Sequence, residues 1–319
     1  MTELTVLVPA YNEADGLADF HARLAAVLDT IPGTVRVLYV DDGSSDPTWD
    51  AITALGAADA RVTGLRLSRN FGKEAAMTAG LDNVDADAVV VIDADLQDPP
   101  EVIPALIERW RAGYDVVYAT RRVREGESGF KRLTSAAFYR VMEKLSDTPV
   151  PRDTGDFRLL SRRAVEALRQ LRERQRFMKG LFTWVGYRQT AVVYDRHSRH
   201  AGKTHWNYWR LWNLAMEGIT SFSTAPLRLA TWVGVSAACV AFLYGLWVII
   251  KVLAFGDPVR GYPTLLVVIL FLGGAQLLAL GVIGEYVGRN YAESKARPIY
   301  FIEDRLASRG DNRTDHARD

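Results

Sequence analysis

Two long stretches without a charged residue constrain the fold of this chain more than any other feature of its sequence. They are Thr231–Ile250 and Gly261–Gly284. Each is long enough to cross the roughly 30 Å hydrocarbon core of a bilayer as a helix. Because the connection between them is short, the sequence predicts a two-helix transmembrane hairpin over residues 227–290, with helices at about 229–254 and 262–288.

The charges around these stretches indicate how the hairpin is oriented. Arg228 precedes the first predicted helix, and Arg289, Lys295 and Arg297 follow the second. Lys251 and Arg260 lie near the ends of the connection. This modest excess favours both termini, and the residues before the hairpin, on the cytoplasmic side of an inner membrane. The polar start Met1-Thr2-Glu3 leads directly into a strand pattern, so no signal peptide is expected.

Composition excludes some classes of function. The 39 Lys and Arg residues balance 38 Asp and Glu residues, so the formal charge of +1 gives no sign of nucleic-acid binding. The single cysteine, Cys239, lies in the first uncharged stretch. It excludes an intramolecular disulfide and a thiolate metal site, and it is interpreted as a packing residue.

Before the hairpin, short apolar runs alternate with segments of helical length and spacing. The runs that predict strands are Leu4–Val8, Val35–Val40, Val62–Leu67, Val89–Ile92 and Val116–Tyr118. Such an alternation is typical of an α/β fold with a mostly parallel, doubly wound sheet. Ligands of these folds bind at the carboxyl edge of the sheet, where the polar clusters of this chain also fall.

An acidic cluster follows the fourth of these strands. Asp93, Asp95 and Gln97 alternate directly after Ile92. If the segment is extended, their oxygens point to one side and offer hard ligands to Mg²⁺ or Mn²⁺. Such a metal accepts phosphate oxygens, which suggests a nucleotide substrate. The structural alternative is that Asp98 caps a helix entered through prolines while the other acids are solvated.

Several motifs resemble those of the inverting glycosyltransferases of family 2, which have the nucleotide-binding, Rossmann-like GT-A fold. They are VPAYNE at Val8–Glu13, VDDGSSD at Val40–Asp46, RNFGKEAAMTAG at Arg69–Gly80 and DADLQDPPE at Asp93–Glu101. Three later motifs are similar to those of the polyprenyl-phosphate glycosyltransferases: Asp153–Arg162, Arg196–Trp209 and Gly284–Tyr300. The resemblance implies a catalytic domain over residues 1–205, an amphipathic interface segment over 206–226, the hairpin over 227–290 and a cytoplasmic tail over 291–319, disordered at its end.

The resemblance also implies roles for individual residues. Those expected to contact the nucleotide sugar are Pro9, Tyr11, Glu13, Asp42, Asp93 and Arg121. The metal ligands would be Asp93, Asp95 and Gln97, with Asp95 the direct ligand. Asp156 resembles the proposed catalytic base or acceptor-positioning residue. A lipid phosphate is already mostly ionised at neutral pH, so positioning of the acceptor or of Arg158 remains an alternative to base catalysis.

A basic and aromatic segment precedes the hairpin. Arg196, Arg199 and Lys203, together with Lys131 further upstream, are expected to bind the acceptor phosphate, while Trp206 and its aromatic neighbours suit a membrane interface. An amphipathic helix docked on the protein's own core is the competing interpretation. His205 stands where the related motif usually has lysine, so a phosphate role at that position is in doubt.

The expected function is transfer of one sugar, best assigned to UDP-glucose, onto polyprenyl (undecaprenyl) phosphate, with Mg²⁺ or Mn²⁺ and with inversion. GDP-mannose, UDP-N-acetylglucosamine or a modified amino or uronic sugar remain alternative donors. A non-catalytic nucleotide-sugar-binding scaffold is the alternative class of function. Processive synthases and transporters would require further motifs or spans that are not found. Small residues in the second span, such as Gly273 and Gly281, suit a homo-oligomer like the tetramer known in related proteins.

Overall fold

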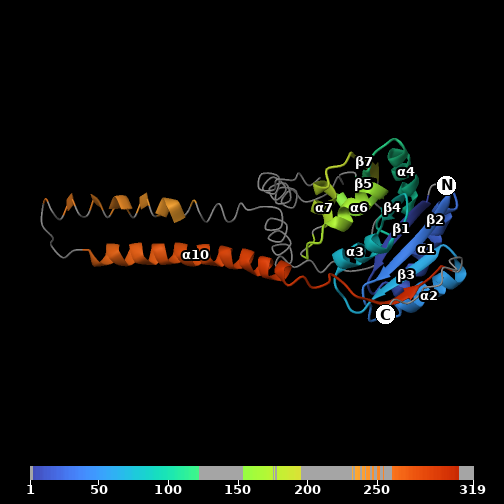
Figure 1. Ribbon diagram of the computed structural model, residues 1–319, viewed down its shortest axis with the longest axis horizontal. Helices are drawn as coiled ribbons and strands as arrows, with labels where there is room; N and C mark the ends of the chain where they lie inside the picture. The colour runs from blue at the N-terminus through green and yellow to red at the C-terminus, as the bar shows by residue number, and fades with distance from the viewer. Residues whose placement is uncertain are drawn as a thin grey trace. The chain divides into compact units, whose positions relative to one another are not determined.

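The computed structural model describes residues 3–121, residues 154–194 apart from 175 and 177, individual helical positions between 232 and 254, and residues 261–308. The described residues fall into two compact units. Those up to 194, together with 297–308, belong to the first unit, and those from 232 to 296 belong to the second. Figure 1 shows the strands of the first unit and the long helix α10 of the second.

An eight-stranded mixed sheet forms the centre of the first unit. Its strands are β1 (Glu3–Ala10), β2 (Thr34–Asp41), β3 (Val62–Leu67), β4 (Ala88–Val91), β5 (Val116–Arg121), β6 (Thr154–Ser161), β7 (Gln189–Tyr194) and β8 (Ile302–Leu306), in the order β7-β5-β6-β4-β1-β2-β3-β8. All five strands predicted from sequence are confirmed. The parallel core β4-β1-β2-β3 is Rossmann-like, which confirms the predicted α/β class.

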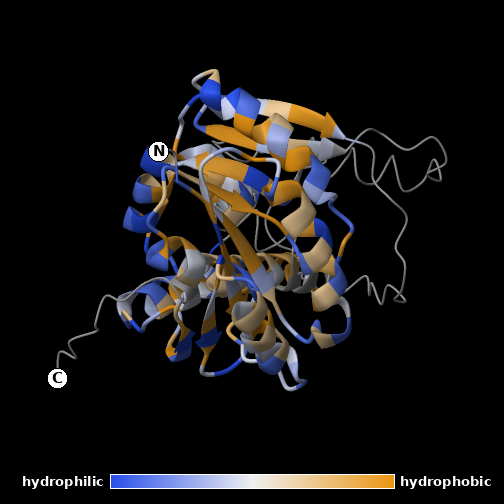
Figure 2. Ribbon diagram, turned by 90° about the vertical axis from the view of Figure 1, so that its right-hand side faces the viewer, coloured by the Kyte–Doolittle hydropathy of each residue, from blue (hydrophilic) through white to orange (hydrophobic). Residues whose placement is uncertain are grey.

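The strands at the centre are buried on both faces. In β1 every residue after Glu3 is buried, and all of β4 is buried. Parallel strands covered by helices on both sides read as continuous apolar runs, which explains why these segments show no alternation of polar and apolar residues. Figure 2 shows hydrophobic strands beside helices that carry both hydrophobic and hydrophilic residues.

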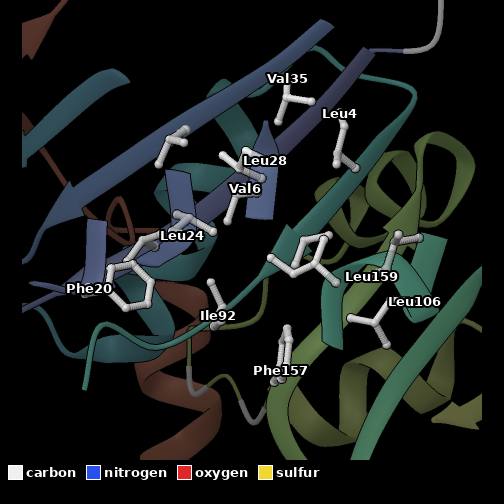
Figure 3. Close-up of a cluster of buried hydrophobic side chains, with 14 of the residues drawn as sticks. Leu4, Val6, Phe20, Leu24, Leu28, Val35, Ile92, Leu106, Phe157 and Leu159 are labelled. Atoms are coloured by element: carbon white, nitrogen blue, oxygen red, sulfur yellow. The ribbon is translucent and has the colours of Figure 1, made fainter. Parts of the chain in front are cut away.

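The helices cover the two faces of the sheet. They are α1 (Ala14–Leu28), α2 (Thr48–Ala58), α3 (Lys73–Asn83), the 3₁₀ helix η1 (Pro100–Val102), α4 (Ile103–Arg111), α6 (Arg162–Gln170) and α7 (Met178–Trp184). Val6 of β1 packs in one core cluster with Leu24 of α1 and Leu106 of α4 (Figure 3). Leu7 points to the opposite face, where it meets Gly80 of α3.

One edge of the sheet collects the chain segments that form the candidate site. The parallel strands β1 to β4 all end there. β6 runs antiparallel to β4, with Arg158 opposite Val91, so the beginning of β6 reaches the same edge. This antiparallel strand was not predicted from sequence. Its register places Asp156 next to the segment that follows β4.

The segment after α10 returns to the sheet. The sequence predicts a cytoplasmic tail over residues 291–319, and within that range Ile302–Leu306 forms β8, which pairs antiparallel with β3. Leu306 packs against the glycines of α2 and β3, with its Cδ2 atom 2.6 Å from where a Cβ would stand on Gly56. Because the apolar Leu306 is held against the core, the strand is favoured although three of its five residues are charged.

The second unit contains α10 (Tyr262–Ser294), whose Phe271–Ser294 portion is long and apolar enough to cross a membrane. This agrees with a helix at the second predicted span. Among the described positions of the first predicted span, Gly234–Tyr244 forms only a shorter apolar helix. A single candidate span is therefore found in the described part of the chain, and the two-helix hairpin is not confirmed. Cys239 lies there with an exposed thiol.

The contact of α3 with β1 leads to a prediction about stability. A Cβ on Gly80 would lie 2.1 Å from Leu7 Cδ1 and 3.0 Å from Leu7 Cγ, and Leu7 is fully buried. We expect Gly80→Ala to lower the free energy of unfolding by about 1–3 kcal/mol, because the core cannot accept the methyl group without shifting. Thermal denaturation of the detergent-purified chain measures this effect.

Gly16→Ala in α1 is the matched control, since no atom lies within 4 Å of its added Cβ. Alanine is favoured over glycine in helices by about 1 kcal/mol, so this variant should be as stable as the wild type or more so. Equal destabilisation by both substitutions would contradict the packing of α3 on β1.

Candidate functional site

A pocket of about 270 Å³ lies at the carboxyl edge of the parallel strands. Its lining comes from the loops after β1, β2, β3 and β4: Pro9, Ala10, Tyr11, Glu13, Asp42, Asn70, Gly72, Lys73, Ala76, Asp93, Ala94 and Asp95. Six of these were predicted from sequence as site residues. The sequence argument that the polar clusters converge at one edge is therefore confirmed.

The first two loops are tied to each other by hydrogen bonds. The side-chain oxygen of Asn12 accepts from the backbone N–H of Ser45 at 2.9 Å, and Ser44 Oγ accepts from the N–H of Asn12 at 2.9 Å. Asn12 has a φ of 54°, a left-handed conformation that asparagine tolerates better than most residues. These contacts fix the backbone of Pro9–Glu13, from which Tyr11 extends with 45% of its surface exposed.

Asp42 ties the second loop to the third. Its two carboxylate oxygens accept from the N–H groups of Phe71, at 2.8 Å, and Gly72, at 2.9 Å. Burial raises the pKa of Asp42, although these two hydrogen bonds oppose the rise. Gly43 beside it has a φ of +62°, and a Cβ there would lie 2.3 Å from the carbonyl carbon of Arg69. Asp42 thus lines the pocket and also fixes its wall.

The acidic segment after β4 is not extended as the sequence suggested. It turns at Leu96, whose φ is +56°, and the N–H of Gln97 donates to Asp95 Oδ1 at 3.1 Å. Asp93 and Asp95 line the pocket, whereas Gln97 is buried and does not appear in its lining. Asp98 accepts a hydrogen bond from the hydroxyl of Tyr194, and the residue at the N-cap position of η1 is Pro99.

Lys73, the first residue of α3, joins two carboxylates from different strands. Its Nζ lies 2.6 Å from Asp93 Oδ1 and 2.5 Å from Asp156 Oδ2. Burial lowers the pKa of Lys73, but the two carboxylates raise it by more, so the side chain stays an ammonium. Burial raises the pKa of Asp93, and Lys73 offsets this only in part. Burial also raises the pKa of Asp156, but the charges of Lys73 and Lys179 lower it by more. The pKa of Asp156 therefore lies below its usual value.

Asp156 offers one further acceptor. Its Oδ1 atom is buried and has no hydrogen-bond partner among the residues that the structure describes. Arg158, two residues on, donates to the backbone oxygens of Gly155, at 2.7 Å, and Asp156, at 3.3 Å, and its guanidinium stacks on the ring of Phe182. Arg158 therefore holds the backbone of this segment, while the Asp156 carboxylate is held by Lys73.

The pocket can hold a divalent cation between its acids. Within the described part of the chain, no group of three or more His, Cys, Asp or Glu side chains is arranged as a metal site. Mg²⁺, however, is commonly held by only one or two carboxylates together with waters and substrate phosphates. Asp93 and Asp95 meet that requirement, and Asp95 is exposed to the pocket. The donor set thus fits a hard cation that takes its remaining ligands from water or from a bound substrate.

Other predicted site residues cannot be placed in this pocket. Arg121 is the last residue of β5, but only its backbone is described. Those outside the described residues are Lys131, Arg196, Arg199, Lys203 and His205, together with the interface segment 206–226. The acceptor-phosphate site therefore remains a prediction from sequence.

Sequence reasoning missed Lys73 and Glu74. Both follow Gly72, which takes a φ of +99° at the N-cap of α3, and a polar pair at a helix start on the carboxyl edge is the signal that was available. Glu74 accepts from the N–H of Met178, the first residue of α7, at 3.1 Å. Burial, and then the negative charge of Asp156, raise the pKa of Glu74 to about 7.

Comparison with protein families gives two matches. The model described as glycosyl transferase family 2 matches residues 5–169, and the model described as GtrB C-terminal hairpin matches residues 225–289. The first match runs from within β1 to the last turn of α6 and contains every described residue of the pocket. The second contains most of α10.

Individual relatives are similar over nearly the whole chain. An uncharacterized glycosyltransferase of Synechocystis is 50% identical, over 95% of both chains. The bactoprenol glucosyl transferase of Shigella phage SfV is 50% identical, over 94% of this chain and 98% of its own. A solved mannosyltransferase of Pyrobaculum calidifontis is 18% identical, with a TM-score of 0.47 over 87% of this chain and 86% of its own.

The raised pKa of Glu74 predicts how stability depends on pH. The folded chain binds this proton more tightly than the unfolded chain, whose glutamate has a pKa of 4.5, so the free energy of unfolding falls as pH rises from about 4.5 to about 7. Glutamine keeps an acceptor for Met178 but carries no charge. We expect Glu74→Gln to raise the melting temperature by a few degrees at about pH 8 and to have little effect at about pH 4.5.

Glu166→Gln, at an exposed position of α6, is the control and should match the wild type at both pH values. Melting curves of the three proteins measure the difference. An equal change in melting temperature on Glu74→Gln at about pH 4.5 and about pH 8 would show that burial does not raise the pKa of Glu74 in the folded chain.

Proposed function

The chain belongs to glycosyl transferase family 2, and from this premise we propose that it transfers one glucosyl residue from UDP-glucose to undecaprenyl phosphate. The transfer depends on Mg²⁺ or Mn²⁺, inverts the anomeric carbon and takes place at the cytoplasmic leaflet of the inner membrane. The bactoprenol glucosyl transferases that match at about half identity support both the sugar and the lipid acceptor.

The observation that carries this proposal is the charge of the pocket. Its lining contains the carboxylates of Glu13, Asp42, Asp93 and Asp95, and among the described residues Lys73 is the only basic one in it. Such a surface repels a nucleoside diphosphate unless a cation is bound as well. Asp93 and Asp95 would hold that cation, which supplies positive charge to the diphosphate as it leaves.

The residues at the beginning of β6 support a direct displacement. The acceptor phosphate oxygen attacks the anomeric carbon, and the bond to the diphosphate breaks with its electron pair leaving on the nucleotide. Asp156 is a weak base because Lys73 lowers its pKa, and the phosphate needs little deprotonation at neutral pH. We assign Asp156 to positioning of the acceptor through its Oδ1 atom, which has no hydrogen-bond partner among the described residues.

The connectivity of the chain supports the membrane topology. β8 lies in the same sheet as β1 to β7, so the chain returns to the unit that it leaves after β7. The chain between the end of β7 and the start of β8 must therefore cross the bilayer an even number of times, if it crosses at all. Since Phe271–Ser294 is long enough for one span, a partner span at about 229–254 completes the hairpin. The catalytic domain and both ends of the hairpin then share the cytoplasmic side.

Small residues of α10 support the proposed homo-oligomer. A Cβ added to Gly273, Gly281, Gly284 or Gly288 would meet no atom within 4 Å. These positions leave room for close approach of another helix. We propose a tetramer, which the mass of the detergent-purified protein, measured by light scattering, would test.

The decisive experiment is a transfer assay with detergent-purified protein, undecaprenyl phosphate, Mg²⁺ or Mn²⁺, and single nucleotide sugars, read by mass spectrometry of the lipid. A lipid heavier by one hexose with UDP-glucose alone supports the proposal. Transfer only from GDP-mannose or UDP-N-acetylglucosamine would replace the donor. Metal-dependent nucleotide binding without any transfer would favour the non-catalytic scaffold.

We expect Asp95→Asn to lower metal-dependent turnover at least about a hundredfold, because the amide removes the charge that holds the cation. Asparagine keeps an oxygen for the hydrogen bond from Gln97, so the turn is preserved. Asp50→Asn, at an exposed position of α2, is the control and should retain wild-type turnover. Near-normal turnover of Asp95→Asn would show that this carboxylate is not the direct ligand.

A further inference from the structure

The residues just before β8 contact both ends of helix α3, which begins at the pocket. Phe301 reaches the loop before the helix: its carbonyl accepts from the N–H of Ser68 at 3.0 Å, and its ring lies 6.3 Å from that of Phe71. Tyr300 reaches the other end, where its hydroxyl donates to Asp82 Oδ2 at 3.1 Å. The segment therefore spans α3 from its entrance to its last turn.

The loop held by Phe301 forms one wall of the pocket. Phe71 has two ring partners: the guanidinium of Arg69 stands 4.0 Å from its ring centre, and the ring of Phe301 contacts it at a tilt of 52°. The N–H of Phe71 and that of Gly72 are the two donors to Asp42. A displaced Phe71 ring would move the backbone on which Asp42 depends, and Asn70 and Gly72 of the wall with it.

Phe301 contributes little to the core. The residue is 55% exposed, whereas Leu306 at the end of the following strand β8 packs onto the core cluster. Leu306 therefore contributes hydrophobic stabilisation that Phe301 does not. The aromatic contact of Phe301 has a separate effect, which is to fix the position of the third loop.

We propose that Phe301 is a positioning residue for the donor nucleotide. It holds the loop of Ser68–Lys73 against Asp42, and this loop forms one wall of the nucleotide pocket. The identity of the nucleotide rests on the function proposed above, but the mechanical role does not. Because Phe301 is joined through residues 295–300 to the end of α10, the membrane segment and the donor pocket are connected by a few residues of chain.

The test compares Phe301→Ala with the wild type in the full-length protein in detergent. An aromatic pair contributes about 0.5–1.5 kcal/mol, so we expect UDP to bind about two- to tenfold more weakly in the presence of Mg²⁺. The KM for the donor should rise by the same factor, while kcat and the KM for undecaprenyl phosphate stay unchanged. Hydrogen exchange at the amides of Phe71 and Gly72 should become faster without any nucleotide present.

Two further variants separate positioning from general stability. Phe301→Tyr keeps the ring and should restore UDP binding and slow exchange. Leu306→Ala removes core packing from β8, the strand that follows Phe301. It should lower the melting temperature but leave the donor KM of the folded enzyme unchanged.

Unchanged exchange at Phe71 and Gly72 in Phe301→Ala overturns the proposal, whether or not UDP is the nucleotide. An equal rise of the donor KM in Leu306→Ala also overturns the proposal, because the change in donor KM would then follow from loosening β8 and not from losing the ring of Phe301. Wild-type protein that fails to bind UDP or to transfer a sugar contradicts the proposed function instead, and the exchange measurement still decides the role of Phe301.

Discussion

The ammonium of Lys73 is the charge on which the arrangement of the site depends. It stands between Asp93, which follows β4, and Asp156, which begins β6, within 2.6 Å of each. Two carboxylates brought this close in a partly buried place repel each other unless a cation lies between them. Lys73 meets that need because α3 starts directly at the carboxyl edge. Asp93 after β4 and Asp156 in β6 can therefore lie close together, each paired with Lys73.

Hydrogen bonds between loops make the rest of the pocket rigid. Asn12 joins the first loop to the second, and Asp42 joins the second to the third. Each bond uses a backbone N–H, so the path of the chain is fixed along with the side chain. A wall fixed in this way needs little reorganisation when a ligand binds, and its acidic surface suits the diphosphate and cation of the proposed function.

The return of the chain to the sheet connects its two units. The segment after α10 pairs with β3, and its aromatic residues contact α3 and the loop before it. A free tail would leave β3 as an exposed edge strand and the third loop without support on that side. The pairing with β3 and the support of the third loop both depend on this short segment.

The sequence alone determined the five strands before residue 121, their parallel core and the carboxyl edge at which the pocket lies. Buried parallel strands leave a continuous apolar run, and the polar residues at their ends must converge. Only the tertiary structure decided that Lys73 meets Asp93 and Asp156, because the antiparallel register of β6 is not encoded in spacing. It also decided that Gln97 turns away at Leu96 and that Ile302–Leu306 joins the sheet. A local backbone conformation and a pairing between distant segments depend on the packing of the whole domain, which no window of sequence contains.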